Sequence, residues 1–256
     1  MERYALIGFP IGHSLSPALF RAAYPEDGML YDLIEEPSFE NACRKFISDY
    51  DAVNVTAPFK EAAFLKADTA DTVTQVLRAT NLLIKRRDDG RIAAYNTDFW
   101  AVNNLLRLYR EPGATRKVAV VGCGGAGMAA AYAATNLNLD TTVINRNIAK
   151  AEAFCLRAGR MSAAALTSLP VIIGEADIVI YTVPLHLEGV TRDLLRGKVV
   201  IEANYRNPCL EDLCSDGTRY VSGLEWLLWQ AVSGFGIMTG KSPDETSMKA
   251  LLLSKL

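Results

Sequence analysis

The chain has 256 residues, half of them hydrophobic and 22% charged, which is the balance of a folded globular protein and excludes extensive disorder. Its 27 basic and 29 acidic residues leave a net charge of −2, so we expect neither nucleic acid nor an anionic membrane as a partner. At about 150 residues per domain, the length favours two domains.

The chain lacks the sequence features of an exported or membrane protein. A charged pair followed by an apolar run to Gly8 indicates a strand rather than a signal peptide. The uncharged run 118–134 is rich in Gly and Ala and is interrupted by a glycine cluster. The five cysteines form no CxxC pair, and two histidines are too few for a His-based metal site. We therefore expect a cytoplasmic protein with reduced thiols and no metal.

In the first hundred residues, short apolar runs alternate with helical patterns. Strands are predicted at residues 4–9, 31–34, 52–56, 81–85 and 92–95, with the turn Asp88-Asp89-Gly90 between the last two. Helices are predicted at residues 17–24, 39–50, 58–66 and 98–109. The segment 110–115, which contains Pro112 and Gly113, then interrupts the pattern.

A second alternating series follows this break. Strands are predicted at residues 117–122, 141–146, 178–183 and 199–205, and helices at residues 125–137 and 148–158. Two more predicted helices, 224–232 and 244–256, carry Leu and Trp at helical spacing. Strands and helices that alternate in this way predict an α/β fold with a mainly parallel sheet and right-handed crossovers.

A glycine-rich turn joins the strand at 117–122 to the next helix. Gly122 permits a tight turn, Gly124 and Gly125 let the backbone approach a pyrophosphate, and Gly127 lets the helix pack closely on the strand. The free N–H groups at the start of the helix favour an anion there. A plain packing turn is the alternative, but the order strand, turn, helix favours a dinucleotide site.

The end of the next strand bears on which dinucleotide binds. NAD sites usually place an acidic residue there for the ribose 2′-hydroxyl, whereas a 2′-phosphate requires a basic residue. The sequence has Asn145 and Arg146 at this point, and Lys150 one turn further along. Arg146 can pair with a phosphate through two hydrogen bonds or stack on adenine. The alternative is that both basic residues are solvated charges at a helix start, but the pattern favours NADP.

Three segments in the first hundred residues are polar where a purely structural role would not require it. They are Gly8-Phe-Pro10-Ile-Gly-His13-Ser14-Leu-Ser16-Pro17, Asn54-Val-Thr56-Ala-Pro58-Phe-Lys60 and Asn96-Thr97-Asp98. With the glycine turn, they resemble the shikimate dehydrogenase family. The resemblance covers nearly the whole chain, because Asn81, Tyr205-Arg-Asn-Pro208 and the segment from Gly223 to Gln230 also follow the family's order.

The resemblance implies two lobes. A substrate-binding α/β domain would comprise residues 1–99 plus 224–256, with the C-terminal helices returning to the first lobe. A Rossmann-type NADP-binding domain would comprise residues 100–223. The implied cofactor contacts are Gly122, Gly124, Gly125, Ala126, Gly127, Asn145, Arg146, Lys150, Val183 and Gly223.

The resemblance also implies roles for the polar segments. Ser14 and Ser16, at a helix entrance, would bind the substrate carboxylate, and ordinary helix capping by Ser16 is the simpler alternative. Lys60 would donate the proton to the reacting oxygen, although a lysine on an amphipathic helix is more often only a surface charge. Asp98 would pair with Lys60 and a substrate hydroxyl, and its alternative is an N-cap of the helix that follows.

Four further residues, Thr56, Asn81, Tyr205 and Gln230, are implied as substrate contacts. Two segments depart from the family's usual pattern. Tyr181-Thr182-Val183-Pro184 replaces an Asn-Ala-Thr type of sequence, and Trp226-Leu227 replaces Met-Leu on the side of the cofactor. These departures concern the contacts of the cofactor rather than the reaction.

The function implied by the resemblance is the reversible, NADPH-dependent reduction of 3-dehydroshikimate to shikimate on the way to chorismate and the aromatic amino acids. Two alternatives stay open: an NAD-using quinate/shikimate dehydrogenase, and a non-catalytic regulatory protein of the same fold. The pairing of Lys60 with Asp98 disfavours the second, because a protein that only senses its ligand does not need both. A homodimer is an open alternative for the assembly.

Overall fold

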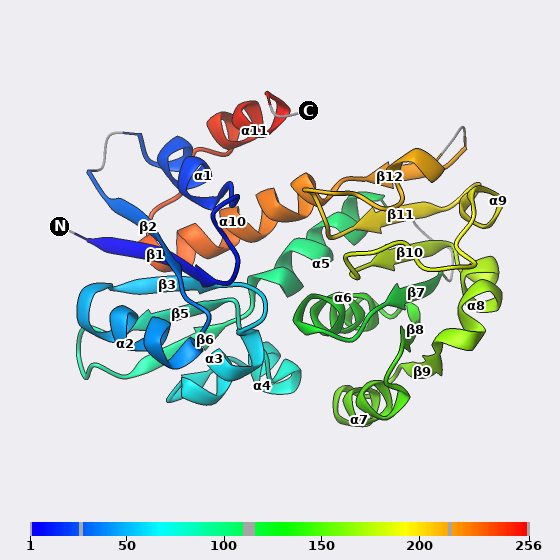
Figure 1. The fold of residues 1–256 in the computed structure, drawn as a ribbon, viewed down its shortest axis with the longest axis horizontal. Coiled ribbons are helices and arrows are strands. Elements are labelled where there is room, and N and C mark those ends of the chain that lie inside the picture. The colour runs from blue at the N-terminus through cyan, green and yellow to red at the C-terminus, as the bar shows by residue number, and fades with distance from the viewer. Residues whose placement is uncertain (1, 26–27, 110–115, 215–216, 255–256) are drawn as a thin grey trace. The chain divides into compact units, whose positions relative to one another are not determined.

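Two sheets of six strands organise the residues that the computed structural model describes, which are 2–25, 28–109, 116–214 and 217–254 (Figure 1). The chain divides into two compact units, one of Met1–Thr97 with Leu228–Leu256 and one of Asp98–Leu227. The division falls two residues before the expected end of the first lobe at residue 99 and four residues after the expected return at residue 224. The predicted break at 110–115 lies outside the described residues.

The sheet of the first unit has the strand order β2-β1-β3-β5-β6-β4. Its strands are β1 Arg3–Gly8, β2 Leu30–Glu35, β3 Ala52–Val55, β4 Thr69–Ala70, β5 Leu82–Lys85 and β6 Ile92–Tyr95. Strand β5 runs antiparallel to its neighbours β3 and β6, and the remaining pairs are parallel. The sheet is therefore mainly parallel, as the alternating pattern predicts.

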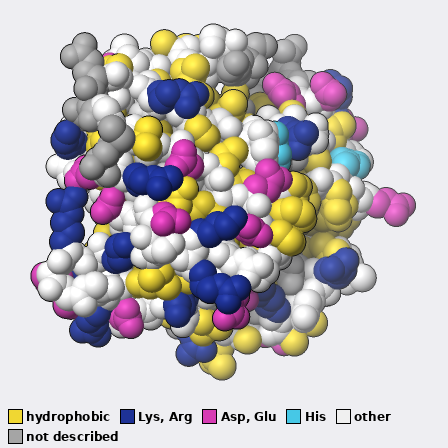
Figure 2. Space-filling view, turned by 60° about the vertical axis from the view of Figure 1, so that its left-hand side comes forward, with side chains coloured by type: hydrophobic (Ala, Val, Ile, Leu, Met, Phe, Trp, Pro, Cys, Tyr) yellow, Lys and Arg dark blue, Asp and Glu magenta, His cyan; other side chains and the backbone are white. Residues whose placement is uncertain are grey.

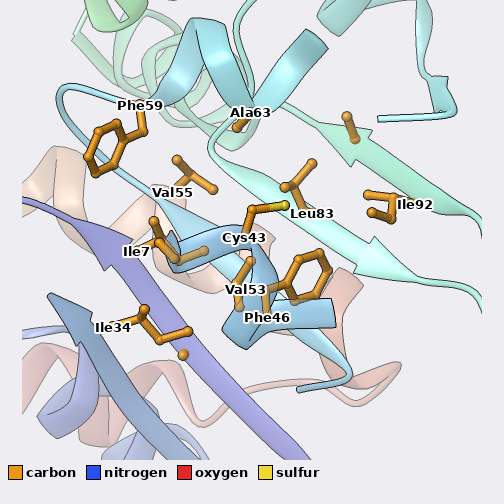
Figure 3. Close-up of a cluster of buried hydrophobic side chains, with 13 residues drawn as sticks. Ile7, Ile34, Cys43, Phe46, Val53, Val55, Phe59, Ala63, Leu83 and Ile92 are labelled. Carbon is orange, nitrogen blue, oxygen red and sulfur yellow. The ribbon is translucent and has the colours of Figure 1, made fainter. Parts of the chain in front are cut away.

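Helices cover both faces of this sheet. They are α1 Ser16–Ala23, α2 Phe39–Asp49, α3 Lys60–Lys66, α4 Thr72–Leu77, the part of α10 Gly223–Thr239 from Leu228 onward, and α11 Glu245–Leu253. On one face, Val53 and Leu83 of the strands pack with Cys43 and Phe46 of α2 (Figure 3). On the other, Phe20 of α1 contacts the rings of Tyr31 and Phe235 at centroid distances of 4.8 and 5.0 Å.

The second unit contains a doubly wound parallel sheet. Its strands are β7 Lys117–Val121, β8 Asp140–Asn145, β9 Ser162–Ala165, β10 Ile178–Tyr181, β11 Val199–Glu202 and β12 Arg219–Val221. Their order is β12-β11-β10-β7-β8-β9, and every pair is parallel. Counted along the chain from β7, this is the order 3-2-1-4-5-6 of a Rossmann sheet.

The helices of the second unit lie on both faces of its sheet (Figure 1). They are α5 Thr97–Tyr109 from Asp98 onward, α6 Gly125–Asn136, α7 Ile148–Ala158, α8 Leu169–Glu175 and α9 Arg192–Leu195, with short 3-10 turns at Leu166–Ser168 and Glu211–Leu213. Leu169, Ile173 and Leu195 of α8 and α9 are buried on one face. The other face holds α6, whose alanines are small enough for the helix to lie close to the strands.

The predicted α/β fold class is confirmed, and the differences are local. Helix α5 begins at Thr97 rather than at residue 98, and α10 continues to Thr239 rather than ending at residue 232. Sequence reasoning missed short elements such as β4, α4, α8 and β12. No helix within the described residues is long and apolar enough to cross a membrane. On the face that Figure 2 shows, basic and acidic side chains are interspersed, in keeping with a net charge of −2.

Candidate active site

Two polar turns lie side by side in the first unit, one after β1 and one after β3. The N–H of Phe9 donates to the carbonyl of Ala57 at 3.2 Å, and the N–H of Thr56 donates to the carbonyl of Ile7 at 2.9 Å. A Cβ on Gly8 would lie only 2.5 Å from Cγ2 of Thr56, so glycine permits this close approach. The structure therefore joins the segment that leads to Ser14 with the segment that leads to Lys60.

The two predicted serines are adjacent at the start of α1. The Oγ atoms of Ser14 and Ser16 are 3.2 Å apart and hydrogen-bonded, and Ser14 Oγ also accepts from the N–H of Ser16. The alternative in which Ser16 caps the helix is wrong, because the helix begins at Ser16 and its N-cap is Leu15, which makes no side-chain cap. Ser16 is buried and Ser14 is half-buried, so the pair has one hydroxyl nearer the solvent.

Behind the serines lies a buried tyrosine that sequence reasoning missed. Burial raises the pKa of Tyr31 far above its ordinary value, and a hydrogen bond with Ser16 opposes the shift. The Tyr31 hydroxyl donates to Asn54 Oδ1 at 2.8 Å, and Asn54 Nδ2 donates to the carbonyl of Asn81 at 3.2 Å. In a strand, Tyr31 resembles an ordinary core residue, and no local signal distinguishes it.

Asn81 continues this polar network. Its Oδ1 accepts from the N–H of Thr97 at 2.7 Å, and its Nδ2 donates to Thr97 Oγ1 at 2.9 Å and to Gln230 Oε1 at 3.4 Å. Asn81 is 3% exposed, so its amide is satisfied by protein atoms. The structure thus brings the predicted residues Asn81 and Gln230 together, although 149 residues separate them in the sequence.

Lys60 is the first residue of α3 and is half-buried. Its carbonyl accepts from the N–H of Thr80 at 2.9 Å, one residue before Asn81. The buried ring of Phe59, in the core under α2 and α3, holds the start of α3 against the sheet. The backbone at Lys60 is therefore tied to the same segment as Asn81, and Thr56 lies four residues before it, half-buried.

Asp98 belongs to the second unit and lies in the first turn of α5. The alternative in which it is the N-cap is wrong, because the helix already begins at Thr97. Its side chain is buried at 4% exposure, and Oδ1 accepts a hydrogen bond of 3.0 Å from the indole Nε1 of Trp226. This contact joins a predicted catalytic residue to one of the two segments that depart from the family's pattern.

The glycine turn after β7 has the geometry that a dinucleotide requires. Gly122 has φ of +105°, and a Cβ there would lie 2.5 Å from Thr182 Oγ1. At Gly127 a Cβ would lie 2.1 Å from the carbonyl oxygen of Gly122, so only glycine fits. At Gly124, the N-cap of α6, no atom lies within 4 Å of such a Cβ. The residues present fit a pyrophosphate at the start of α6.

This turn lies at the point where the strand order reverses. Strands β7 and β10 are neighbours, and the next strands along the chain pair on their outer sides, which is where ligands bind in open α/β sheets. Thr182, just after β10, donates from Oγ1 to the carbonyl of Val121 at 2.8 Å. Val183 follows, with Cγ1 at 3.1 Å from the position of a Cβ on Gly122. Val183 therefore lies against the glycine turn, as a cofactor contact would require.

The end of β8 approaches the same turn. Asn145 Oδ1 accepts from the N–H of Cys123 at 3.2 Å, which links the strand end to the glycine turn. Asn147 caps α7 by accepting from the N–H of Lys150 at 3.1 Å. Arg146, between them, is exposed, and Lys150 is half-buried. Of the two basic residues, Arg146 and Lys150, only Arg146 is exposed next to the turn.

The loop after β11 carries Tyr205 and touches the start of α10. A Cβ on Gly223 would lie 2.7 Å from the backbone N of Tyr205, so these two predicted residues are neighbours. The carboxylate of Glu202, which is fully buried, accepts from the N–H groups of Cys209 and Leu210 at 2.6 and 3.1 Å. Glu202 also accepts from the Tyr220 hydroxyl at 2.9 Å. Sequence reasoning missed Glu202, which closes this loop.

A doubly wound sheet with a glycine turn at its switch point, together with a second α/β unit lined with buried polar groups, defines a dinucleotide-dependent dehydrogenase of two units. Family models agree. "Shikimate dehydrogenase substrate binding domain" matches residues 6–83, and "Shikimate / quinate 5-dehydrogenase" matches residues 108–198.

Full-length relatives extend the match over nearly all of the chain. The shikimate dehydrogenase (NADP(+)) of Dehalococcoides mccartyi is 32% identical, over 96% of this chain and 93% of the relative. The shikimate dehydrogenase (NADP(+)) of Staphylococcus aureus is 30% identical, over 99% of this chain and 98% of the relative. The Thermus thermophilus enzyme, solved with NADP(H) and shikimate, is 27% identical over 100% of both chains, with a TM-score of 0.85. The chain belongs to the shikimate dehydrogenase family.

Proposed function

We propose that the chain is a shikimate dehydrogenase that reversibly reduces 3-dehydroshikimate to shikimate with NADPH, as an enzyme of aromatic amino-acid biosynthesis. The observation that carries the proposal is the continuous polar network of the first unit. It runs from Ser14 and Ser16 through Tyr31 and Asn54 to Asn81, Thr97 and Gln230. A small polyhydroxylated acid requires hydroxyl, amide and carboxylate partners of this kind.

In this proposal most of the substrate contacts come from the first unit, and the second unit binds the cofactor. Ser14 and Ser16 hold the substrate carboxylate, because their hydroxyls are adjacent and each can turn its one proton to a carboxylate oxygen in place of the Ser14–Ser16 hydrogen bond. Thr56, Asn81 and Gln230 bind the ring hydroxyls. The amide N–H groups of Asn81 are already donated to Thr97 and Gln230, so Asn81 would accept from a ring hydroxyl through the second lone pair of Oδ1. Tyr205 is assigned to the carboxylate or to the side of the cofactor.

Lys60 and Asp98 carry the acid–base chemistry. The lysine ammonium has three donors, and it polarises the C3 carbonyl and gives a proton to the oxygen as the alkoxide forms. The carboxylate of Asp98 accepts from a substrate hydroxyl and complements the positive charge of Lys60. Both roles need fixed side chains, and in each case the backbone is part of a hydrogen-bonded or helical segment.

The glycine turn fits NADP(H). Gly122, Gly124, Gly125, Ala126 and Gly127 would hold the pyrophosphate with backbone N–H groups at the start of α6. The 2′-phosphate is assigned to Asn145 and Arg146 at the end of β8 and to Lys150 in the first turn of α7. Val183 and Gly223 would line the remainder of the cofactor site. When bound, the cofactor supplies the hydride.

One assay tests the proposal. The purified chain should oxidise NADPH in the presence of 3-dehydroshikimate and reduce NADP in the presence of shikimate. A protein that uses NAD and quinate equally well would instead be the broader quinate/shikimate dehydrogenase, and one that binds shikimate without turnover would be a regulatory protein. Light scattering of the same preparation separates a monomer from a homodimer, because the mass doubles.

A further inference from the structure

We propose that Trp226 is a positioning residue that fixes the carboxylate of Asp98 for the reaction. The inference rests on the proposed role of Asp98 in binding and catalysis. It concerns a residue at which the chain departs from its family, and it begins from one contact: the indole Nε1 of Trp226 donates to Oδ1 of Asp98 at 3.0 Å.

Both partners are withdrawn from solvent. Asp98 and Trp226 are each 4% exposed, so water cannot replace the indole N–H around this carboxylate oxygen. A buried carboxylate depends on such donors, and a hydrogen bond to a charged group is stronger than one between neutral groups. The indole offers a single donor on a rigid ring with two rotatable bonds, so its direction is well defined.

The backbone of Asp98 is already held by its neighbours. Before it, the N–H of Thr97 donates to Asn81 Oδ1 at 2.7 Å. After it, Phe99 is buried and contacts the ring of Tyr132 on α6 at a centroid distance of 5.6 Å. What the backbone does not set is the rotation of the Asp98 side chain. The hydrogen bond from the indole to Oδ1 restricts that rotation and, with it, the direction of Oδ2.

Trp226 is itself held at the start of α10. The adjacent residue, Glu225, accepts from the hydroxyl of Tyr109 at 2.5 Å, and the guanidinium of Arg219 lies 4.5 Å from the centre of the Tyr109 ring. Two successive residues of α10 thus contact α5 near its first and its last residue. A donor fixed in this way can select one rotamer of the aspartate, which a flexible side chain such as Met could not do.

The test removes only the N–H. Incorporation of β-(3-benzothienyl)alanine at position 226 puts sulfur in place of the indole nitrogen and keeps the ring size, whereas Trp226→Phe also shortens the side chain. We expect both changes to weaken shikimate binding about tenfold in calorimetry, which corresponds to about 1.4 kcal/mol, and to lower kcat by a similar factor. The Kd for NADP should stay within about twofold.

Trp229→Phe is the matched control. Trp229 lies one turn further along α10, is half-buried, and contacts Lys249 rather than Asp98. It should leave shikimate binding and kcat unchanged. If Trp226→Phe fails to fold, the benzothienyl variant still gives the answer, because it preserves the packing.

A double-mutant cycle in shikimate affinity decides whether Trp226 acts through Asp98. In an Asp98→Ala background, Trp226→Phe should change the Kd for shikimate by no more than about twofold. A tenfold loss that persists in this background, or a benzothienyl variant that binds and turns over like the wild type, overturns the positioning role while leaving the proposed function intact. If Asp98→Ala itself binds and reduces substrate normally, the proposed role of Asp98 fails first, and the inference fails with it.

Discussion

In the first unit, the candidate site consists of side-chain oxygen and nitrogen atoms that contact one another. Asn81 alone makes three side-chain hydrogen bonds, to the backbone and hydroxyl of Thr97 and to Gln230. In the second unit, the turn after β7 depends on glycines, which have no side chain. A Cβ on Gly127 would lie 2.1 Å from a backbone oxygen, and one on Gly124 would meet nothing within 4 Å.

This difference has a physical reason. A substrate that carries several hydroxyls and a carboxylate is distinguished by hydrogen bonds from specific side chains, and each bond requires a particular atom. A pyrophosphate is recognised by backbone N–H groups and by the helix dipole, which every residue provides as long as nothing blocks the approach. Substitutions that remove polar side-chain atoms should therefore impair the first unit. The second unit should also be impaired by substitutions that add side-chain atoms to the glycine turn.

The largest effect is expected for Lys60→Ala. If this lysine donates the proton in the transition state, its loss should lower kcat by about 10²–10⁴ and change KM much less. Steady-state kinetics with 3-dehydroshikimate measure both constants. Lys66→Ala, at the exposed end of the same helix α3, is the control and should behave like the wild type. A variant with nearly normal kcat and a raised KM would reduce Lys60 to a binding residue.

The second prediction concerns a place in the nucleotide unit where a side chain, rather than the backbone, should recognise the cofactor. Arg146 is exposed at the end of β8, and no acidic residue takes its place. Two phosphate contacts that contribute about 3–4 kcal/mol would give a preference for NADP of about 10² or more. Arg146→Ala should therefore raise the KM for NADP steeply and leave that for NAD nearly unchanged.

Lys150→Ala supplies the comparison for Arg146. A lysine is a point charge that salt screens more easily than a paired guanidinium. We therefore expect Lys150→Ala to raise the KM for NADP less than Arg146→Ala does, and the increase to become smaller at high ionic strength. Equal use of NAD and NADP by the wild type, or equal weakening of both by Arg146→Ala, would remove Arg146 from the phosphate site.

The third prediction tests the serine pair. Each hydroxyl that donates to a carboxylate contributes about 1.5–3 kcal/mol, so Ser14→Ala with Ser16→Ala should raise the KM for shikimate by at least about tenfold. The KM for NADP should not change. The single variant Ser14→Ala separates binding from folding, because Ser14 is half-buried and lies outside the helix, whereas Ser16 is buried. A loss of thermal stability alone would contradict the binding role.

The sequence predicts best the turns and helices that are determined by residues close together in the chain. The turn from Gly122 to Gly127 and the helix Ile148–Ala158 follow from local patterns, and both lie where they were expected. The missed contacts join residues that are far apart: 23 residues separate Tyr31 from Asn54, and 128 separate Asp98 from Trp226. Periodicity shows only that such residues face inward, and it does not show which polar atom each one meets.

Helix ends were the other source of error. The helical spacing of the apolar residues predicts a helix from residue 98, with Asp98 as its alternative N-cap, whereas α5 begins one residue earlier, at Thr97. Leu and Trp at helical spacing predict a helix that ends at residue 232, whereas α10 continues to Thr239 through two glycines, 234 and 236. Gly234 is tolerated because the helix lies close to Asn54 and Thr97 there, with a Cβ position at 3.4 Å from Asn54 Nδ2. Packing thus overrides the low helix propensity of glycine.

The smallest effect is expected for Gly124→Ala, and it tests the comparison most directly. The change adds one methyl group at the N-cap of α6, where the protein itself leaves open space, so its cost in stability should be less than about 1 kcal/mol. If the pyrophosphate lies against this backbone, the same methyl group should raise the KM for NADP about fivefold. Gly174→Ala, in α8, also fits its surroundings, with Leu194 at 3.6 Å, and should leave NADP binding unchanged. Kinetics and thermal melts of the two variants give the answer. If Gly124→Ala has the same KM for NADP as Gly174→Ala, the cofactor does not approach Gly124 and the turn serves packing alone.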